Sequence, residues 1–334
     1  MTHQTQEIQI ELCSPLLLGT SREYAIFAET QNYIPGGVLR GSLARLMQET
    51  APAEAFTMLF GTPSAGVIFE NLYASPSAAS YTHPLPLSAR TCKYHGGFLG
   101  QRHKDHGVGD ILIRQAGFEE VLLDPGAKLP FFYQPRCPDP TCQEEVTRPT
   151  VEFYETIGAR YFPVTVPIRR LSRTAINRSR HTAADQLLYT LETIEPGELK
   201  YGDRKRLVFR GAVHCQPHQV ELLQQWLPRL EWLGRGRSRG LGQVTLKLVD
   251  PTPIRWPLPE RLKAFHEKVL QEWSFFEYVA GVDLVPAETL FFSLDLLAPA
   301  IFTHYGLPAT QPDLADLGLN PTKAAICRAF TDQE

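Results

Sequence analysis

The chain has 334 residues, of which 43% are hydrophobic and 21% charged, a balance typical of a globular protein and not of a disordered or fibrous one. No stretch reaches about 18 consecutive apolar residues, and the amino-terminal MTHQTQEIQ lacks a signal-peptide core, so we expect a cytoplasmic protein without a membrane segment. Six cysteines at irregular spacing indicate free thiols or metal ligands more than disulfides.

The charge is unevenly distributed along the chain. The formal net charge is −3, which by itself argues against nucleic acid. Residues 160–247, however, hold 16 Lys and Arg against 7 Asp and Glu, so they carry +9 and the remainder carries −12. A basic region attracts a phosphate backbone through counterion release, whatever the net charge of the chain. The middle of the chain is therefore the predicted nucleic-acid-binding part.

Hydrophobic periodicity predicts alternating strands and helices. We expect strands at 7–12, 67–73, 151–154, 161–168, 187–194, 207–214 and 243–249, and helices at 38–47, 218–233 and 257–279. Residues 75–149 are rich in Pro, Gly, His and Cys and are predicted to be an insertion. Residues 1–250 then follow the order of an α+β, ferredoxin-like (RRM-like) domain, whose sheet can offer one face to RNA.

The remaining residues, 251–334, are predicted to hold a connecting helix and the start of a second ferredoxin-like unit. The segment LFFSLDLLAPAI at 290–301 is similar to EIQIELCSPLL at 7–17, which suggests a repeat. About 45 residues are too few to complete such a unit. Either the chain ends early, or the second half lies on another polypeptide, or the segment adds to the first domain.

Residues 233–244, LGRGRSRGLGQV, alternate glycine with arginine between a predicted helix and a predicted strand. Glycines let a loop expose several backbone N–H groups on one side, and guanidiniums offer planar donor forks that fit phosphates. Neither GxxxxGK[ST] nor the strand, GxGxxG, helix order is present, so a nucleic-acid backbone fits better than a nucleotide. The predicted RNA-binding residues here are Gly234, Arg235, Gly236, Arg237, Arg239, Gly240 and Gly242.

The segment YIPGGVLRG at 33–41 opens the first predicted helix. Free N–H groups and the helix dipole at its amino end favour an anion. We therefore expect Tyr33, Gly36, Gly37 and Arg40 to touch RNA. The alternative is a simple turn into a helix, with Arg40 solvated.

Five arginines fall within residues 169–180: Arg169, Arg170, Arg173, Arg178 and Arg180. Small and hydroxyl residues lie between them instead of glutamates, so helical i,i+4 salt bridges cannot neutralise them. This predicts a second RNA-binding segment. The alternative is a solvated charged hairpin.

The insertion contains Cys92 and His95, with two residues between them, and Cys137 and Cys142, with four residues between them. Two such pairs have the spacing of a structural zinc site, a zinc-knuckle-like device that would hold a polar insertion together. His103 and His106 are alternative fourth ligands. Unrelated reduced thiols on a loop are the other interpretation.

Together these motifs resemble the CRISPR-associated RAMP superfamily. The glycine-rich loop before the last strand and YIPGGVLRG resemble two signatures of that family, and the arginine segment resembles its "thumb" hairpin. CKYHGGF at 92–98 and HGVGD at 106–110 resemble the type III-D effector subunit of the Csx-ten kind. The resemblance implies a non-catalytic subunit of a type III-D ribonucleoprotein in antiviral defence. Such a subunit binds the 5′ handle of the crRNA and caps the complex beside the large polymerase-like subunit and the backbone RAMP subunits.

Two alternatives to this function remain open. Some RAMP proteins cleave precursor crRNA, and the weak catalytic candidates here are His181, with Tyr24 or Tyr189, and Asp185. A metal-independent cut needs a base near a ribose 2′-OH and an acid for the leaving oxygen, and the sequence places no such pair. The second alternative is a zinc-stabilised scaffold subunit that binds only protein.

Overall fold

The protein is described by a computed structural model, in which a mixed α+β architecture with several small sheets confirms the predicted class. For residues 23–24, 175–177 and 182–187 only the backbone is described. The described residues are 4–19, 23–24, 27–61, 66–76, 81–100, 104–128, 132–158, 160–177, 179–180, 182–197, 207–251, 257–285, 289–294, 302–304, 307–309, 311–315, 317–320, 324 and 326.

The chain forms two compact units. The first comprises Met1–His83, Phe153–Gly158 and Pro163–Pro253, and the second comprises Pro84–Glu152, Ala159–Phe162 and Ile254–Glu334. One of the small sheets has three strands in the order β11-β10-β6. Its strands are β6 (Thr82–Pro84), β10 (Phe153–Ile157) and β11 (Arg160–Val164).

An antiparallel sheet in the order β15-β1-β14-β4 is the base of the first unit, with β5 also paired to β14. The strand expected at 67–73 is split into β4 and β5 by the turn between them. The strands are β1 (Gln4–Leu12), β4 (Ile68–Phe69), β5 (Tyr73–Ser75), β14 (Val208–Cys215) and β15 (Val244–Val249).

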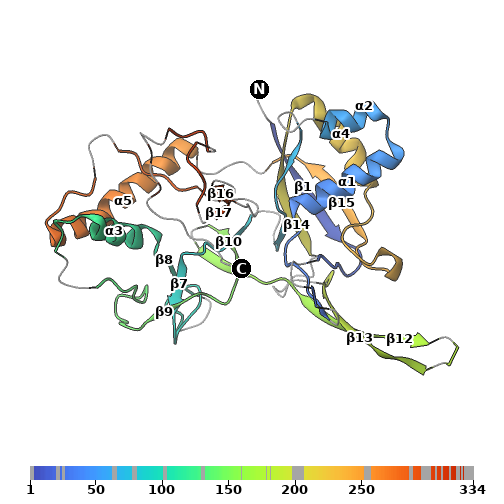
Figure 1. The fold of residues 1–334 in the computed structure, drawn as a ribbon, viewed down its shortest axis with the longest axis horizontal. Coiled ribbons are helices and arrows are strands. Elements are labelled where there is room, and N and C mark those ends of the chain that lie inside the picture. Colours follow the sequence, from blue (N-terminus) through green and yellow to red (C-terminus); the bar gives the residue numbers. More distant parts are fainter. Residues whose placement is uncertain are drawn as a thin grey trace. The chain divides into compact units, whose positions relative to one another are not determined.

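Three helices pack on one face of this sheet: α1 (Gly36–Thr50), α2 (Ala53–Phe60) and α4 (Pro217–Trp226) (Figure 1). Alternate residues of β1, Ile8 and Ile10 among them, are buried beneath the helices, and each such side chain contributes about 1.5–3 kcal/mol by leaving water. The last helix ends before the expected residue 233. Pro228 has no N–H to continue the ladder, so the chain turns into the 3-10 turn η1 (Leu227–Arg229).

The opposite face of the sheet carries a buried ion pair between Glu7 of β1 and Arg210 of β14. Arg210 Nε donates to Glu7 Oε1 at 2.6 Å, and Arg210 Nη2 donates to Glu7 Oε2 at 2.8 Å. Tyr81 Oη also donates to Glu7, and the Tyr81 ring lies 4.8 Å from Arg210 Cζ. Glu7 is 1% exposed. At this point the sheet therefore does not offer the open RNA-binding face that the sequence suggested.

A long hairpin of β12 (Ile168–Asn177) and β13 (Thr182–Ile194) extends away from the sheet of the first unit (Figure 1). β13 also pairs in parallel with β3 (Phe27–Ala28), which pairs with β2 (Glu23–Tyr24). At the base, Leu16 and Ile194 exchange two backbone hydrogen bonds of 2.8 Å. The hairpin is therefore anchored where the chain leaves β1.

The second unit combines a small sheet with two packed helices, α3 (Leu112–Leu123) and α5 (Leu258–Ala280). Trp273 Nε1 donates to Ile113 O at 2.9 Å, and a Cβ added to Gly117 would lie 2.7 Å from Trp273 Cδ1. This packing places the insertion with the carboxy-terminal segment, whereas we expected it within a domain of residues 1–250. The sheet has the order β8-β7-β9, from β7 (Ala89–Cys92), β8 (Val108–Asp110) and β9 (Val146–Thr147).

The predicted start of a second ferredoxin-like unit is not present in the described residues. Residues 289–294 form no strand, and 295–301 lie outside the described residues. Phe291 packs instead against Trp273, with ring centroids 4.8 Å apart. A short hairpin of β16 (Phe302–His304) and β17 (Leu307–Ala309) follows. Among the residues that the structure describes, no helix is long and apolar enough to cross a bilayer.

Candidate nucleic-acid interface and metal centre

The glycine-arginine segment is a closed loop between η1 and β15. Leu233 N–H donates to Gly242 O at 2.8 Å, which closes its base. Within it, Arg237–Arg239 form one 3-10 turn, η2, between Gly236 (φ +80°) and Gly240 (φ +76°), both left-handed. The loop therefore has a fixed shape set by its glycines.

Two glycines of the loop are required by close backbone contacts as well as by positive φ. A Cβ on Gly234 (φ +73°) would lie 2.3 Å from Leu17 O, and a Cβ on Gly242 (φ +83°) would lie 2.0 Å from Leu233 O. Gly240 has the same backbone region with no atom within 4 Å of such a Cβ. A comparison of Gly240 with Gly242 therefore separates the cost of a left-handed backbone from the cost of a steric clash.

We expect Gly240→Ala to lower the free energy of unfolding by about 1–2 kcal/mol, the cost of a left-handed alanine. Gly242→Ala should cost clearly more, because its Cβ also meets the Leu233 carbonyl. The melting temperatures of the two variants measure the difference. Equal losses would show that this contact does not shape the loop.

Several backbone N–H groups of the loop are used within the protein. Arg235 N–H donates to Leu17 O at 2.9 Å and Gly242 N–H donates to Pro15 O at 2.8 Å, which anchors the loop to the chain after β1. Leu241 N–H donates to Gly236 O within the loop at 3.2 Å. These N–H groups are therefore not available to an anion.

All three loop arginines are exposed, and two are held against aromatic rings. Arg237 Cζ lies 5.3 Å from the centre of the Trp232 ring, and Arg239 Cζ lies 5.4 Å from that of Tyr189 in β13. The Arg235 guanidinium lies against Gly19, where an added Cβ would be 2.9 Å from Arg235 Cζ. Stacking restricts a guanidinium without removing its charge.

The hairpin arginines differ in whether a carboxylate neutralises them. Arg170 Nε lies 2.9 Å from Glu192 Oε1, its direct partner in the β12-β13 register, and Arg169 Nη1 lies 3.9 Å from Glu195 Oε2. The prediction considered only i,i+4 partners along the chain, and these two arginines are neutralised instead by glutamates across the hairpin. No carboxylate pairs with Arg173 among the described residues.

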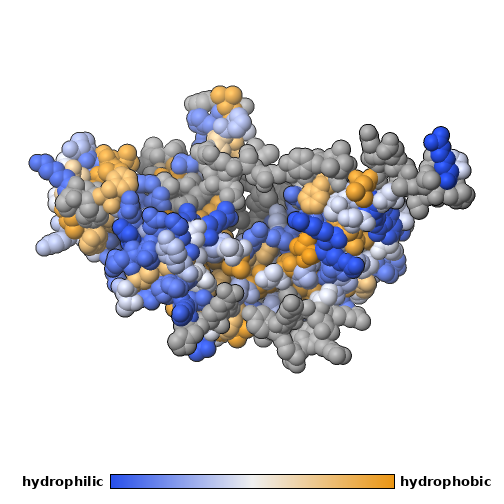
Figure 2. All heavy atoms as spheres, turned by 90° about the horizontal axis from the view of Figure 1, so that it is seen from below, coloured by the Kyte–Doolittle hydropathy of each residue, from blue (hydrophilic) through white to orange (hydrophobic). Residues whose placement is uncertain are grey.

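Of the remaining arginines of this group, Arg180 is exposed and Arg178 lies outside the described residues. Figure 2 shows hydrophilic side chains toward the right of the view. Two of the hairpin arginines, Arg169 and Arg170, are thus neutralised by carboxylates.

The loop and the hairpin meet in a small apolar cluster. Leu17, Leu191 of β13 and Leu241 of the loop are buried together, with Tyr189 packed against them. Two arginine-rich segments that are separate in the sequence are therefore held side by side. Sequence patterns could not reveal this contact, because Leu17 and Leu241 look like ordinary loop residues.

Part of the YIPGGVLRG motif at residues 33–41 serves packing within the protein. Gly36 is buried, its N–H donates to Asn71 Oδ1 at 3.1 Å, and a Cβ there would lie 2.1 Å from Phe69 O. Gly36 is therefore covered by the β4-β5 turn and does not present a free N–H to an anion, contrary to expectation. Tyr33 is half-buried with its ring 5.8 Å from that of Tyr73.

Two later residues of the motif remain accessible. Gly37 is exposed, and no atom lies within 4 Å of the place that an added Cβ would take. Arg40 is also exposed, and its Cζ lies 5.5 Å from the centre of the Phe60 ring. These two residues keep the expected ability to contact RNA.

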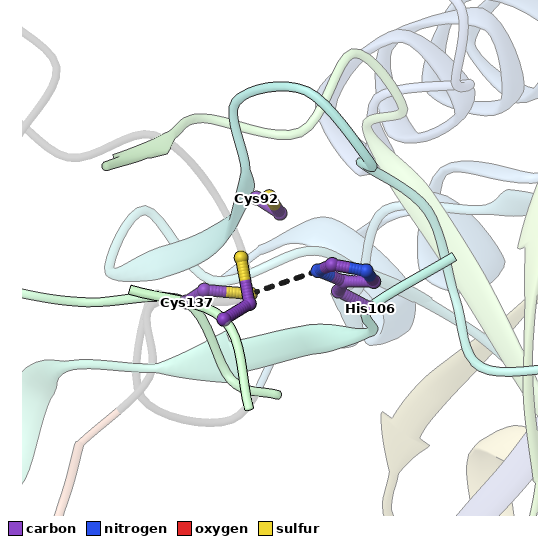
Figure 3. A group of neighbouring side chains, drawn as sticks. Cys92, His106 and Cys137 are labelled. Atoms are coloured by element: carbon purple, nitrogen blue, oxygen red, sulfur yellow. Dashed lines mark hydrogen bonds between the residues drawn. The ribbon is translucent and has the colours of Figure 1, made fainter. Parts of the chain in front are cut away.

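Four side chains of the second unit form a cluster with metal-ligand chemistry. The ligand atoms of Cys92, His106, Cys137 and Cys142 all lie within 4.8 Å of one another, and Figure 3 shows Cys92, His106 and Cys137 converging from separate segments. Tetrahedral Zn–S bonds of about 2.3 Å place neighbouring sulfurs about 3.8 Å apart. The four ligand atoms, three sulfurs and one nitrogen, are therefore gathered closely enough to share one ion with small adjustments.

The histidine of this cluster is His106, one of the two alternatives, and not the expected His95. The register of β7 with β8 pairs Thr91 with Val108, so the residue two places before β8 comes alongside the end of β7. His95 instead uses its backbone: its C=O accepts from His106 N–H at 3.0 Å. His103 lies outside the described residues. The pairing of β7 with β8, the strands before and after this loop, is therefore what selects His106.

The pKa values of Cys92 and Cys137 are shifted in opposite directions by their surroundings. Burial raises the pKa of Cys137 to about 12. Burial also raises that of Cys92, but backbone N–H groups of Tyr94 and His95, with contacts from the other thiols, outweigh it and hold the Cys92 pKa below its ordinary value. Three adjacent sulfurs cannot all be thiolates unless a positive ion offsets their repulsion.

The two nitrogens of His106 face different groups. Nδ1 lies 3.3 Å from Cys137 Sγ, and Nε2 lies 3.9 Å from Asp139 Oδ2. Thr141 donates its hydroxyl and its N–H to Asp139, which lowers the Asp139 pKa and keeps the carboxylate charged. Metal-bound histidines commonly direct their second nitrogen to a carboxylate. The donor set and its surroundings thus fit a metal ion, with Asp139 as a residue that sequence reasoning missed.

The sequence model of the RAMP superfamily matches residues 9–245, a span that includes β1, the hairpin and the loop. The chain belongs to the RAMP superfamily. No curated protein matches this RAMP chain in a sequence search.

Three solved structures similar to this RAMP protein are distant from it in sequence. A chain of the type III-B Cmr-beta complex in its apo state is 11% identical, with 73% of this chain and 97% of that chain covered and a TM-score of 0.36. Oligomeric Cmr4 from Pyrococcus furiosus is 12% identical (75% and 100% covered, TM-score 0.28), and a chain of a type IV-B CRISPR complex is 13% identical (77% and 94% covered, TM-score 0.30). At these TM-scores the similarities do not bear on function.

Of the catalytic candidates of this RAMP chain, only Tyr189 has a side chain that the structure describes. His181 lies outside the described residues, and Asp185 and Tyr24 are described only as backbone positions of β13 and β2. Tyr189, the remaining candidate, lies beneath Arg239. Its surroundings are those of a stacking residue.

Proposed function

We propose that this RAMP protein is a non-catalytic, RNA-binding subunit of a CRISPR effector ribonucleoprotein. The observation that carries the proposal is the junction of the loop arginines with the arginine hairpin at the Leu17, Leu191 and Leu241 cluster. A continuous cationic surface on a fixed scaffold suits a phosphate backbone, and its affinity comes mainly from charge. The order of the main sheet supports a ferredoxin-like domain, since the fourth, first, third and second strands of a β-α-β-β-α-β unit lie side by side.

The finer assignment rests on the family resemblance. CKYHGGF and HGVGD support a type III-D subunit that holds the 5′ handle of the crRNA and caps the complex beside the large polymerase-like subunit and the backbone RAMP subunits. Arginines read charge, so base preference in the handle would come from stacking of splayed bases.

We also propose that Cys92, His106, Cys137 and Cys142 hold a structural zinc ion. Three thiolates and one imidazole are the soft ligands that Zn²⁺ prefers, and four protein ligands would fill its tetrahedral shell and leave no open position for chemistry. The ion would join the ends of β7, β8 and β9 in a unit where loops outnumber regular elements.

The test of RNA binding is the joint change of Arg235, Arg237 and Arg239 to Ala. We expect weaker binding of repeat-derived RNA by about 1–3 kcal/mol and a shallower dependence of affinity on salt, because phosphate contacts are lost. Arg229→Ala is the matched control, since Arg229 is another exposed arginine stacked on an aromatic ring, with Cζ 4.5 Å from Trp226. Equal salt slopes for the wild type and the triple variant would remove the loop from the RNA site.

The same gels separate the alternatives. Discrete RNA products formed without metal by the wild type, and abolished by His181→Ala, would favour a RAMP endoribonuclease. Absence of binding at low salt would favour a zinc-stabilised scaffold that binds only protein. Intact, salt-sensitively bound RNA supports the proposed function.

A further inference from the structure

Tyr189 of β13 is shared by the hairpin and the loop. Arg239 of the loop stands over its ring, 5.4 Å from Cζ to the ring centre. Arg173 of β12 is the residue directly opposite Tyr189 in the antiparallel register, so both side chains lie on the same face of the hairpin. A β-bulge follows Arg173, between Thr174 and Ile176. One guanidinium therefore stacks on the Tyr189 ring, and a second arginine, from the other strand, is the direct cross-strand neighbour of the same residue.

These two arginines lack the neutralising partners that others in the hairpin have. Glu192 and Glu195 pair with Arg170 and Arg169, whereas no carboxylate contacts Arg173 or Arg239 among the residues that the structure describes. Two neighbouring cations without an acid repel each other, and an anion between them converts that repulsion into two charge-assisted hydrogen bonds.

The surroundings fix the positions from which both guanidiniums extend. Tyr189 is half-buried on the cluster of Leu17, Leu191 and Leu241, and the loop that carries Arg239 is closed at its base. A site assembled in advance loses little conformational entropy when its ligand binds.

We propose that Arg173, Tyr189 and Arg239 form one site for a single phosphate of the RNA backbone, with a guanidinium donating to it from each side and the tyrosine ring supporting Arg239. This inference rests on the proposed RNA binding and specifies where hairpin and loop act as one contact. A phosphate held there would also fix the hairpin against the loop.

A double-mutant cycle tests the shared site. Arg173→Gln, Arg239→Gln and the double variant are titrated with labelled single-stranded repeat RNA over a salt series, after each is shown to melt like the wild type. If both arginines hold one phosphate, each single change should weaken binding by about tenfold and reduce the salt dependence by about one contact, and the double change should add little. In the opposite case, the losses of affinity of the two single variants multiply in the double variant and their reductions of the salt dependence add. The two arginines would then hold two separate phosphates, and the proposal would be overturned.

Further variants keep the failure of this site distinct from the failure of RNA binding. Tyr189→Phe keeps the ring and should bind like the wild type, as should Arg229→Gln, whereas Tyr189→Leu should resemble Arg239→Gln. If the Arg173 and Arg239 variants bind normally while the triple loop variant does not, the shared site is wrong and RNA binding stands. If every variant binds normally, the triple loop variant included, RNA binds elsewhere on the protein and the shared site is wrong, whereas a wild type that binds no RNA at low salt would contradict the proposed function itself. A last outcome is that the wild type binds inorganic phosphate tightly while the double variant keeps its full affinity for RNA. The site would then belong to a free anion, which contradicts the proposal.

Discussion

Replacing Cys137 by serine is expected to reduce the zinc content to below one ion per chain and to loosen the second unit around β7, β8 and β9. Cys137 is buried at the centre of the cluster, with Sγ 3.3 Å from His106 Nδ1. Metal binding contributes on the order of 10 kcal/mol to folding in small zinc domains, so loss of one ligand is a large change. Elemental analysis and limited proteolysis measure the two effects.

Two histidines offer a matched pair for the same question. His106→Ala should lose metal as Cys137→Ser does, because the His106 ring faces the sulfurs. His95→Ala should keep it, since His95 takes part through its backbone, although its ring centre lies only 4.6 Å from that of His106. Cys13→Ser, at an exposed cysteine of the first unit, controls for general thiol effects. A wild-type protein without metal, or the opposite behaviour of the two histidines, would contradict the zinc site.

Breaking the ion pair between Glu7 and Arg210 should destabilise the first unit by about 3–5 kcal/mol, since either single change leaves an uncompensated buried charge. Glu7→Gln and Arg210→Met are the variants, and the melting temperature of the first unit is the measurement. The double variant Glu7→Met with Arg210→Met should be more stable than either single variant, because both charges are then gone. Additive losses would show that the two side chains act independently.

The same pair predicts a dependence on pH. Burial alone would raise the pKa of Glu7, but hydrogen bonds from Arg210, Tyr81 and Gln9 outweigh it and hold the pKa below its ordinary value of 4.5. A carboxyl with a lower pKa in the folded state stabilises the fold above its unfolded pKa and loses that contribution as the pH falls through the folded pKa. The wild type should therefore lose stability relative to the double Met variant below about pH 4.5.

The sequence predicted the elements whose own periodicity is strong. The alternation of β1, the stripe of α1 and the long apolar pattern of α5 correspond to observed elements. Helix α3 was missed because its N-cap residue is the apolar Ile111 and it lies inside a glycine- and proline-rich segment. Its apolar face acquires meaning only against Trp273 and Phe276 of α5.

Side-chain partners across strands were harder to predict than the strands themselves. Glu7 looks like the solvent side of an alternating strand, and only the contact with Arg210 and Tyr81 shows that it is buried. The same limit explains Arg170, whose partner Glu192 lies across the hairpin. For the metal cluster, cysteine spacing predicted three members, while the choice of histidine depended on the pairing of β7 with β8.

The most direct test of the central claim is the affinity of the purified wild-type chain for labelled repeat-derived RNA across a salt series. The cationic junction of loop and hairpin predicts that the logarithm of the binding constant falls linearly with the logarithm of the salt concentration. The slope should be about −0.7 for each phosphate contact, and its total should correspond to several contacts. A slope near zero, or no binding at low salt, would contradict the assignment of this RAMP protein as an RNA-binding subunit.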